Sequence, residues 1–133
     1  MHTNDAVYLE DLCPKLKFRQ WRQSIHKFTK KSCIYCGNIS ESIDHILPRS
    51  KGGLSITENC VPACLACNGD KSNSEAFYWY RGQKFYDPRR AMALRAWMDG
   101  DIRLAVRLLQ WANPQKDNNS KIVEENTIEY KAA

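Results

Sequence analysis

The chain has 133 residues, 43% of them hydrophobic, and a formal net charge of +5. This length suits a single domain with short extensions, and no stretch approaches the roughly 18 apolar residues of a membrane span. The N-terminal MHTNDAVYLEDL also lacks an apolar run of signal-peptide length, so we expect a cytoplasmic protein with no membrane partner.

The first predicted element is a basic helix from about residue 14 to residue 30. Pro14 suits a first helical turn, and a stripe of apolar residues follows at spacings of three and four: Phe18, Trp21, Ile25 and Phe28. Such a stripe is typical of a core or docking face rather than of a base-stacking platform. No residue from 12 to 40 is acidic, which favours nucleic acid over a membrane as partner; the alternative is a solvated basic face.

Four of the six cysteines form two pairs, CIYC (Cys33, Cys36) and CLAC (Cys64, Cys67). Each two-residue gap lets both thiolates turn toward one ion, which predicts a tetrahedral four-cysteine zinc site. A closed site of this kind is structural, since no coordination position is left for a substrate. The alternatives are unligated thiols or a redox pair, but a redox pair is expected once and near a βαβ pattern. The other two cysteines are expected to be buried hydrophobes: Cys13 and Cys60.

Short elements are predicted between the two cysteine pairs. ESIDHI, residues 41–46, indicates a strand, and PRSKGG, residues 48–53, indicates a loop marked by its proline and glycines. TENCV, residues 57–61, indicates a second strand, and a short helix is expected to begin near the second cysteine pair. The segment therefore predicts a small α+β unit.

Two helices with clear ends are predicted in the C-terminal third. In YDPRRAMALRAWMDGD, Asp87 can cap the helix, Pro88 fits the first turn and Gly100 can close it. Asp101 can cap a second helix that runs to residue 111 and has one apolar face: Ile102, Ala105, Val106 and Leu109. Residues 114–133 are polar and aperiodic, which predicts a flexible tail.

The order and spacing of these residues resemble those of the HNH endonucleases, the ββα-metal or His-Me finger nucleases. The shared pattern is C-x2-C, DHILPRSKGG, then EN-x4-C-x2-CN-x2-K, over residues 33–71. The resemblance implies an α+β fold: a small ββα-metal core stapled by the four-cysteine zinc site, flanked by an N-terminal basic helix and C-terminal helices. The expected organisation is a basic helical segment (1–31), the nuclease core (32–75), a helical extension (76–113) and the tail (114–133).

The resemblance also implies a role for each matching residue. His45 would be the general base that takes a proton from the attacking water, and Asn59 would hold the His45 ring in its productive orientation. Asp44 and Asn68 would be ligands of a catalytic Mg²⁺ or Mn²⁺, although the namesake pattern has histidine at the position of Asn68. Lys71 would lie near the phosphate or support the fold.

The chemistry of these residues is consistent with the implied roles. A carboxylate and an amide oxygen are hard ligands that suit Mg²⁺ and leave room for waters, and a neutral imidazole is a usable base near pH 7. One difficulty is geometric, because neighbours in a regular strand face opposite ways. We therefore expect the strand to end or twist near His45, so that Asp44 and His45 reach one phosphate.

Simpler interpretations of single residues stay open. His45 alone is more often a structural histidine, Asp44 a turn or ion-pair residue, and Asn59 and Asn68 turn or cap residues. Basic residues are often only solvated, yet two groups are expected to contact nucleic acid together with Lys71: Arg49 and Lys51 in the loop, and Lys15, Lys17, Arg19 and Arg22 in the first helix.

Three functions are therefore compared. The leading one is a metal-dependent HNH endonuclease that cuts or nicks duplex DNA and leaves a 5′-phosphate and a 3′-hydroxyl, as the resemblance implies. The second is a zinc-stapled nucleic-acid-binding module without catalysis, and the third is a protein-interaction module that uses the aromatic C-terminal helices. A binder has no need for Asp44, His45, Asn59 and Asn68 together. A double-strand cut from one small site would need a homodimer or two visits.

Overall fold

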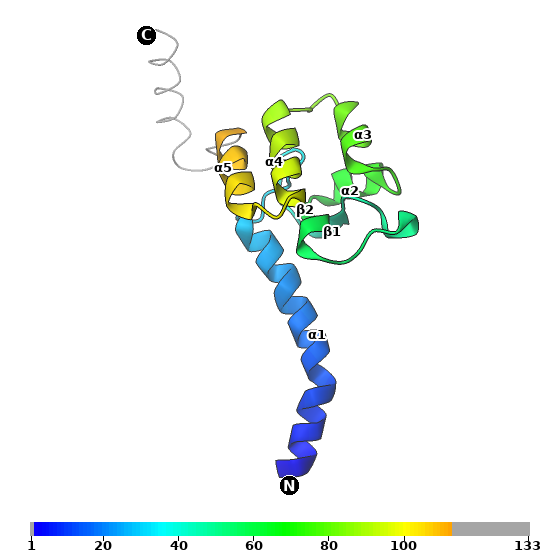
Figure 1. Ribbon diagram of the computed structural model, residues 1–133, viewed down its shortest axis with the longest axis vertical. Coiled ribbons are helices and arrows are strands. Elements are labelled where there is room, and N and C mark those ends of the chain that lie inside the picture. The colour runs from blue at the N-terminus through cyan, green and yellow to red at the C-terminus, as the bar shows by residue number, and fades with distance from the viewer. Residues whose placement is uncertain (1, 113–133) are drawn as a thin grey trace.

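The computed structural model describes the backbone of residues 2–112 and the side chains of residues 14–112. In chain order the elements are α1 (His2–Phe28), β1 (Ser42–His45), the 3-10 turns η1 (Arg49–Lys51) and η2 (Thr57–Asn59), β2 (Cys60–Ala63), α2 (Leu65–Lys71), α3 (Ala76–Arg81), α4 (Pro88–Met98) and α5 (Ile102–Ala112). Over the described residues this is a mixed fold of α-helices and one two-stranded antiparallel sheet, which confirms the expected α+β class (Figure 1).

The sheet and α2 form the ββα unit at the centre of the fold. β1 and β2 pair antiparallel, with Ser42 opposite Ala63 at one end and His45 opposite Cys60 at the other. β2 is buried along its whole length, whereas only Asp44 is buried in β1. α2 follows β2 directly and packs on β1, so residues 42–71 form one compact unit. β1 lies within the predicted segment 41–46, but β2 begins three residues later than the predicted strand 57–61, because residues 57–59 form the turn η2.

α1 begins at His2, so the prediction that it begins at Pro14 is wrong. Proline inside a helix removes one backbone hydrogen bond, but helix-favouring residues on both sides, such as Ala6, Leu9 and Leu16, let the helix continue. Figure 1 shows the N-terminal part of α1 extending away from the rest of the molecule. The first helix is therefore a long arm rather than a short packed element.

The apolar stripe of α1 is core only toward its C-terminal end. Ile25 is fully buried, and Trp21 donates its indole N–H to Thr57 Oγ1 at 2.8 Å. Phe28 packs edge-on against Trp97 with ring centroids 5.8 Å apart, but it remains partly exposed, and Phe18 is 49% exposed. The stripe thus anchors α1 to the body only near the C-terminal end of the helix.

α4 and α5 form as the sequence predicted, because their end signals are local. Asp87 caps α4 by accepting from the Arg89 N–H, Pro88 takes the first turn, and Gly100 adopts a left-handed φ of 84° after the helix. Asp101 accepts the Leu104 N–H at the start of α5. The inner faces pack together, with these side chains buried: Ala93, Leu94, Trp97, Ala105 and Leu109.

α3 was not predicted. Its segment, AFYWYR, is short and almost entirely apolar, so it has no helical periodicity to recognise. Glu75 caps it by accepting the N–H groups of Phe77 and Tyr78, and Trp79 Nε1 donates to Asp70 Oδ2 at 2.9 Å. This helix therefore depends on its packing against the turn at residues 33–36 and against α2, rather than on a periodic pattern in its own sequence.

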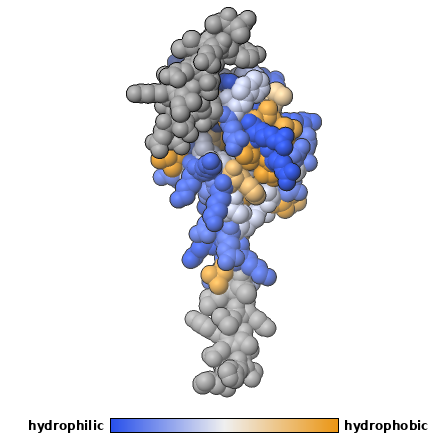
Figure 2. Space-filling view, turned by 90° about the vertical axis from the view of Figure 1, so that its left-hand side faces the viewer, coloured by the Kyte–Doolittle hydropathy of each residue, from blue (hydrophilic) through white to orange (hydrophobic). Residues whose placement is uncertain are grey.

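Two further expectations concern the ends of the chain and membranes. The flexible tail predicted for residues 114–133 lies outside the described residues. Across residues 2–112, no helix combines the length and apolar character needed to cross a membrane. Figure 2 shows mostly hydrophilic side chains on the described part of α1.

Candidate active site and metal centre

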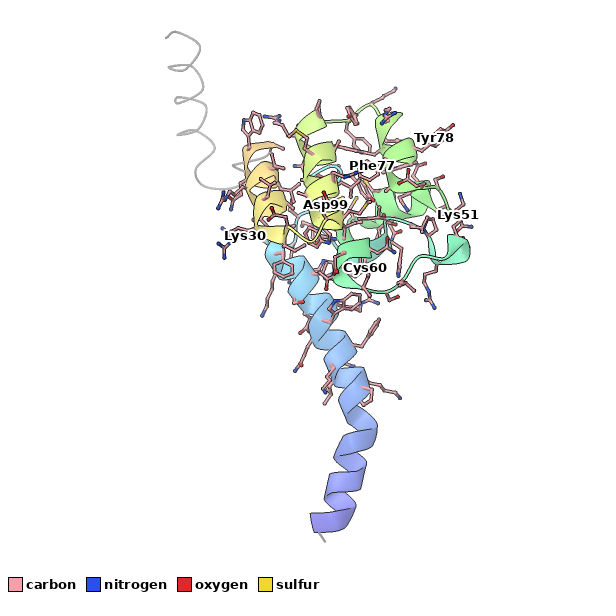
Figure 3. All side chains as sticks on the ribbon, in the orientation of Figure 1. Lys30, Lys51, Cys60, Phe77, Tyr78 and Asp99 are labelled. Atoms are coloured by element: carbon pink, nitrogen blue, oxygen red, sulfur yellow. The ribbon has the colours of Figure 1, made fainter. Side chains whose placement is uncertain are left out.

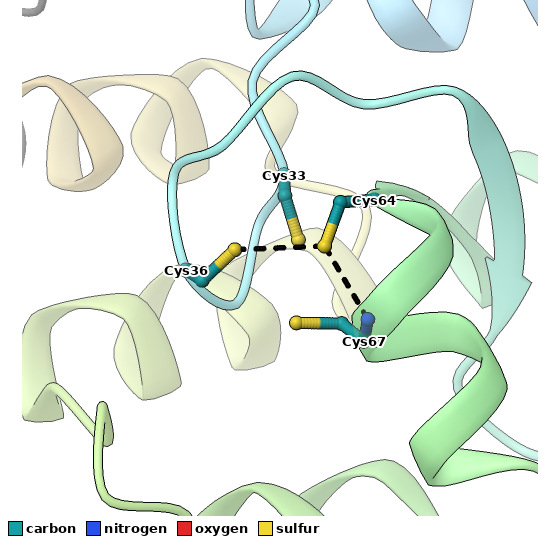
Figure 4. A group of neighbouring side chains, drawn as sticks. All are labelled: Cys33, Cys36, Cys64 and Cys67. Carbon is teal, nitrogen blue, oxygen red and sulfur yellow. Dashed lines mark hydrogen bonds between the residues drawn. The ribbon is translucent and has the colours of Figure 1, made fainter.

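The four paired cysteines converge from two segments, the turn at residues 33–36 and the start of α2 (Figure 4). Their Sγ atoms all lie within 4.8 Å of one another, and the Sγ atoms of Cys36 and Cys64 are 3.6 Å apart. A tetrahedron with Zn–S bonds of about 2.3 Å has sulfur atoms about 3.8 Å apart. Backbone N–H groups also donate to two of the sulfurs, from Asn38 to Cys36 and from Cys67 to Cys64. The cluster therefore fits a zinc ion.

The protonation of the cluster depends on contacts between its sulfur atoms. A hydrogen bond with Cys36 raises the pKa of Cys33 above its usual value, and a hydrogen bond with Cys33 raises that of Cys67. The same contact with Cys33 lowers the pKa of Cys36. Four sulfurs this close cannot all be thiolates without a compensating charge, so a zinc ion would release protons as it binds.

A buried arginine from α4 supports the first cysteine pair. Arg90 is 5% exposed, and its Nη1 donates to the carbonyl oxygens of Cys33 at 3.1 Å and Ile34 at 3.2 Å. A zinc ion with four thiolates carries net negative charge, which a neighbouring guanidinium offsets. The adjacent Gly37, with φ of 83°, completes the turn after CIYC. Arg90 was not identified from the sequence, because only the packing of α4 brings it here.

Asp44 lies on the side of β1 that faces α2 and is 3% exposed. Its Oδ2 accepts the hydroxyl of Tyr35 at 2.5 Å, and its Oδ1 pairs with Lys71 Nζ at 3.1 Å. Burial raises the pKa of Asp44, and the bonds from Tyr35 and Lys71 work against that rise. Both carboxylate oxygens are therefore held in place by donors from other segments.

Lys71 is buried rather than exposed. Its side chain has 0% exposure, and Nζ also donates to the backbone oxygen of His45 at 2.9 Å. A DNA phosphate cannot reach Nζ in this conformation, so the expected nucleic-acid contact of Lys71 differs from what the structure shows. Its position matches the other expectation for this residue, which is support of the fold.

His45 is half-buried at the end of β1, and its ring Nε2 lies 3.0 Å from Ser55 Oγ. Burial lowers the pKa of His45, with Arg49 and Lys71 adding to the effect and Asp44 opposing it. The strand ends at His45 as expected. Even so, the side chains of Asp44 and His45 make separate contacts, Asp44 with Tyr35 and Lys71, and His45 with Ser55. The described conformation does not join them directly.

Asn59 holds the loop next to His45 rather than the His45 ring. Its Oδ1 accepts the Leu47 N–H at 2.9 Å, and its Nδ2 donates to the oxygens of Leu47 at 3.1 Å and Leu54 at 2.9 Å. Gly53 is needed in this loop, because a Cβ there would lie 1.7 Å from Leu47 O. Asn59 therefore holds the loop that carries Ser55, whose hydroxyl lies beside the His45 ring.

Asn68 lies on α2 and faces the same side of β1 as Asp44. Its Nδ2 donates to Ser42 Oγ at 3.0 Å and is 3.4 Å from Ile43 O. Ser42 and Asp44 share one face of the strand, because side chains two residues apart point the same way. A carboxylate oxygen and an amide oxygen are the types of ligand atom that a hard divalent cation binds. Asp44 and Asn68 are the residues that would hold it.

The remaining candidate residues are exposed basic side chains in two places. One group lies on α1: Lys15, Lys17, Arg19 and Arg22. The other lies on η1, where Arg49 and Lys51 are exposed in the loop after His45. Figure 3 shows Lys51 at the edge of the body opposite Lys30. All six side chains are exposed, and the two groups lie on separate elements, α1 and η1.

Comparison with known proteins agrees with this architecture. Residues 33–74, from the first zinc-site cysteine to just past α2, match the model of a family described as HNH endonuclease. The matched segment is therefore similar to HNH endonuclease domains, as the motif pattern indicated, although it covers less than half of the chain. Neither the curated proteins nor the solved structures provided a match.

Proposed function

We propose that the protein is a metal-dependent endonuclease that hydrolyses phosphodiester bonds of duplex DNA. The observation that carries this proposal is the ββα unit itself, which holds His45, Asp44 and Asn68 within the segment that matches the HNH endonuclease family. The four-cysteine cluster would hold a structural zinc ion that keeps this unit folded.

His45 would act as the general base. Its lowered pKa keeps the imidazole neutral at pH 7, which is the form that accepts a proton. When Nε2 carries the ring hydrogen and donates it to Ser55 Oγ, Nδ1 is the nitrogen that can take a proton from the attacking water. The Ser55 hydroxyl can accept this hydrogen, which would leave Nδ1 available as the base.

Asp44 and Asn68 would supply ligand oxygens for Mg²⁺ or Mn²⁺. A bound divalent cation supplies positive charge beside the scissile phosphate and the departing oxygen. Lys71 and Tyr35 would keep the Asp44 carboxylate in a fixed orientation, and water would complete the coordination. By analogy with the family, the products would carry a 5′-phosphate and a 3′-hydroxyl.

Supercoiled plasmid incubated with Mg²⁺ or Mn²⁺ tests the proposal. We expect nicked or linear products, their loss with a chelator while protein-bound zinc stays constant, and a fall of about 10²–10⁴ in rate for His45→Ala. His26→Ala is the matched control, because His26 is also partly buried and also bonded to a serine, Ser40, but lies at the end of α1. A folded His45→Ala protein that cuts at the wild-type rate would contradict the role of His45.

Binding to DNA would rest on the exposed basic side chains of α1. Reversing charge at Lys15, Lys17, Arg19 and Arg22 removes cations that would displace counterions from the phosphates. We expect weaker binding to a DNA duplex and a shallower dependence of affinity on salt. An unchanged affinity and salt slope would exclude α1 as the DNA-positioning element.

A second candidate function is a zinc-stapled nucleic-acid-binding module without catalysis. The observation that favours it is that Asp44 is buried and already engaged by Tyr35 and Lys71, away from the His45 ring. Wild-type protein that binds duplex DNA but cuts no substrate across a series of divalent metals would support this function over the nuclease.

A further inference from the structure

The two donors that hold Asp44 come from the two segments that carry the cysteines. Tyr35 stands between Cys33 and Cys36, and its hydroxyl donates to Asp44 Oδ2 at 2.5 Å. Lys71 stands at the end of α2, the helix that contains Cys67, and its Nζ donates to Asp44 Oδ1 at 3.1 Å. Each half of the four-cysteine cluster therefore supplies one contact to the candidate cation ligand.

The Tyr35 side chain is fixed by its surroundings. It is 1% exposed, and its ring packs edge-on against Trp79 with centroids 5.1 Å apart and lies 5.4 Å from the ring of Tyr80. The Tyr35 carbonyl oxygen also accepts the hydroxyl of Tyr80 at 2.9 Å. The phenol cannot rotate away from Asp44 without disturbing α3, so its hydroxyl has a defined direction.

We propose that Tyr35 is a positioning residue for Asp44, and that its hydrogen bond to Oδ2 sets the affinity of the nuclease site for its divalent cation. This inference rests on the proposed function, since it takes Asp44 as a cation ligand. Each carboxylate oxygen has a second lone pair beside the one that its present donor uses. A carboxylate oriented beforehand from both sides binds a cation without first losing its own freedom, and hydrogen-bonding partners of ligands commonly tune metal affinity in this way.

The test is Mn²⁺ binding by Tyr35→Phe protein without DNA, measured from the electron paramagnetic resonance signal of free Mn²⁺. The site counted is the one that Asp44→Asn abolishes. We expect about 10-fold weaker Mn²⁺ binding with zinc content unchanged. The control is Tyr86→Phe, which removes a phenol hydroxyl from the ring that packs on Tyr80, leaves in place both donors to Asp44 and the Tyr80 bond to Tyr35, and should bind Mn²⁺ as the wild type does.

Cleavage gives a second measurement. In Tyr35→Phe protein the Mn²⁺ concentration for half-maximal plasmid cleavage should rise by the same factor, while the rate at saturating Mn²⁺ stays near that of the wild type. Equal Mn²⁺ binding in Tyr35→Phe and wild-type protein, with wild-type cleavage intact, overturns this inference alone. Wild-type protein that cuts no DNA overturns the nuclease proposal, and weakened Mn²⁺ binding in Tyr35→Phe would then still support the positioning role.

Wild-type protein provides the test if Tyr35→Phe fails to fold with zinc. Mn²⁺ binding at Asp44 should perturb the Tyr35 hydroxyl and produce a buried-tyrosine signal in the ultraviolet difference spectrum. The signal should persist in Tyr86→Phe and be absent in Asp44→Asn. Saturating Mn²⁺ without any tyrosine signal overturns the inference.

Discussion

The four-cysteine site and the site around His45 lie at opposite ends of the same strand pair and differ in composition, exposure and support. The first adjoins the Ser42–Ala63 end, has soft sulfur ligands that are largely buried, and is supported by Arg90. The second lies at the His45–Cys60 end, where an exposed loop supplies Ser55 and Asn59 shapes the backbone.

This difference separates two tasks. A closed, buried site can keep a small fold in shape but has no position for a substrate, whereas a partly exposed histidine on a loop can meet one. Asp44 shares a feature with each site. It is buried like the cysteines, and it belongs to the strand that ends at His45. Changes at the cysteine end should therefore affect folding, and changes at the histidine end should affect chemistry.

The largest expected effect comes from Cys67→Ser. Losing one of four ligands should release zinc, whose binding contributes on the order of 10 kcal/mol to folding in small zinc domains. We expect little bound zinc and loss of helical circular dichroism. Cys60→Ser is the control, because Cys60 is also fully buried but lies outside the cluster. A Cys67→Ser protein with full zinc content and native dichroism would mean that the cluster does not hold the fold together.

Arg90→Met should have the next largest effect. It removes a charged donor from the carbonyl oxygens of Cys33 and Ile34 while nearly preserving side-chain volume, which should cost about 3 kcal/mol. Urea unfolding of the zinc-loaded protein measures this change. Arg95→Met, on the exposed face of the same helix, should be nearly neutral. If the two variants were equally stable, Arg90 would not stabilise the turn at the first cysteine pair.

Asn59→Ala should affect the other end of the strand pair. The change removes three hydrogen bonds to the loop and should cost about 2 kcal/mol. We expect faster hydrogen exchange at the Leu47 amide and slower cleavage, with zinc content unchanged. Asn73→Ala, on the exposed segment after α2, is the comparison variant. Loss of zinc from Asn59→Ala would show that the two sites are not separable in this way.

The smallest effect is the pH dependence of cleavage. Under the proposed function His45 would act in its neutral form, and its pKa lies below the usual histidine value, so activity should be highest at neutral pH and above. It should fall about tenfold per pH unit once the pH drops below the pKa of His45. The raised pKa of Asp44 acts in the same direction, because protonation removes a ligand as pH falls. Cleavage that increases toward acid pH would contradict both roles.

Local signals in the sequence predicted much of the fold. The ends of α4 follow from Asp87, Pro88 and Gly100, which act on their own neighbours, and the cysteine spacing indicated one cluster. The family resemblance of residues 33–74 likewise depends on short motifs with defined spacing. These features could be recognised because each depends on a few residues close together in the chain.

Long-range contacts could not be predicted in the same way. The burial of Lys71, the bond from Tyr35 to Asp44 and the position of Arg90 depend on how separate elements pack. The alternation of side chains along β1 raised the difficulty that Asp44 and His45 face apart, and the structure shows their contacts on different partners. Pro14 misled the prediction of where α1 begins, because a helix can continue through one missing hydrogen bond when its other residues favour it.

The hydrogen bonds from outside the matched segment bear on how that segment can be excised or transplanted. Side chains from α1, α3 and α4 each donate to residues of the 33–74 segment: Trp21 and Trp97 to Thr57, Tyr80 to Tyr35, and Arg90 to Cys33. A fragment cut at the family boundaries would leave these acceptors without donors and would expose the aromatic rings that cover them. Graft or truncation designs should therefore keep α1 from Trp21 onward and the helices that follow the matched segment.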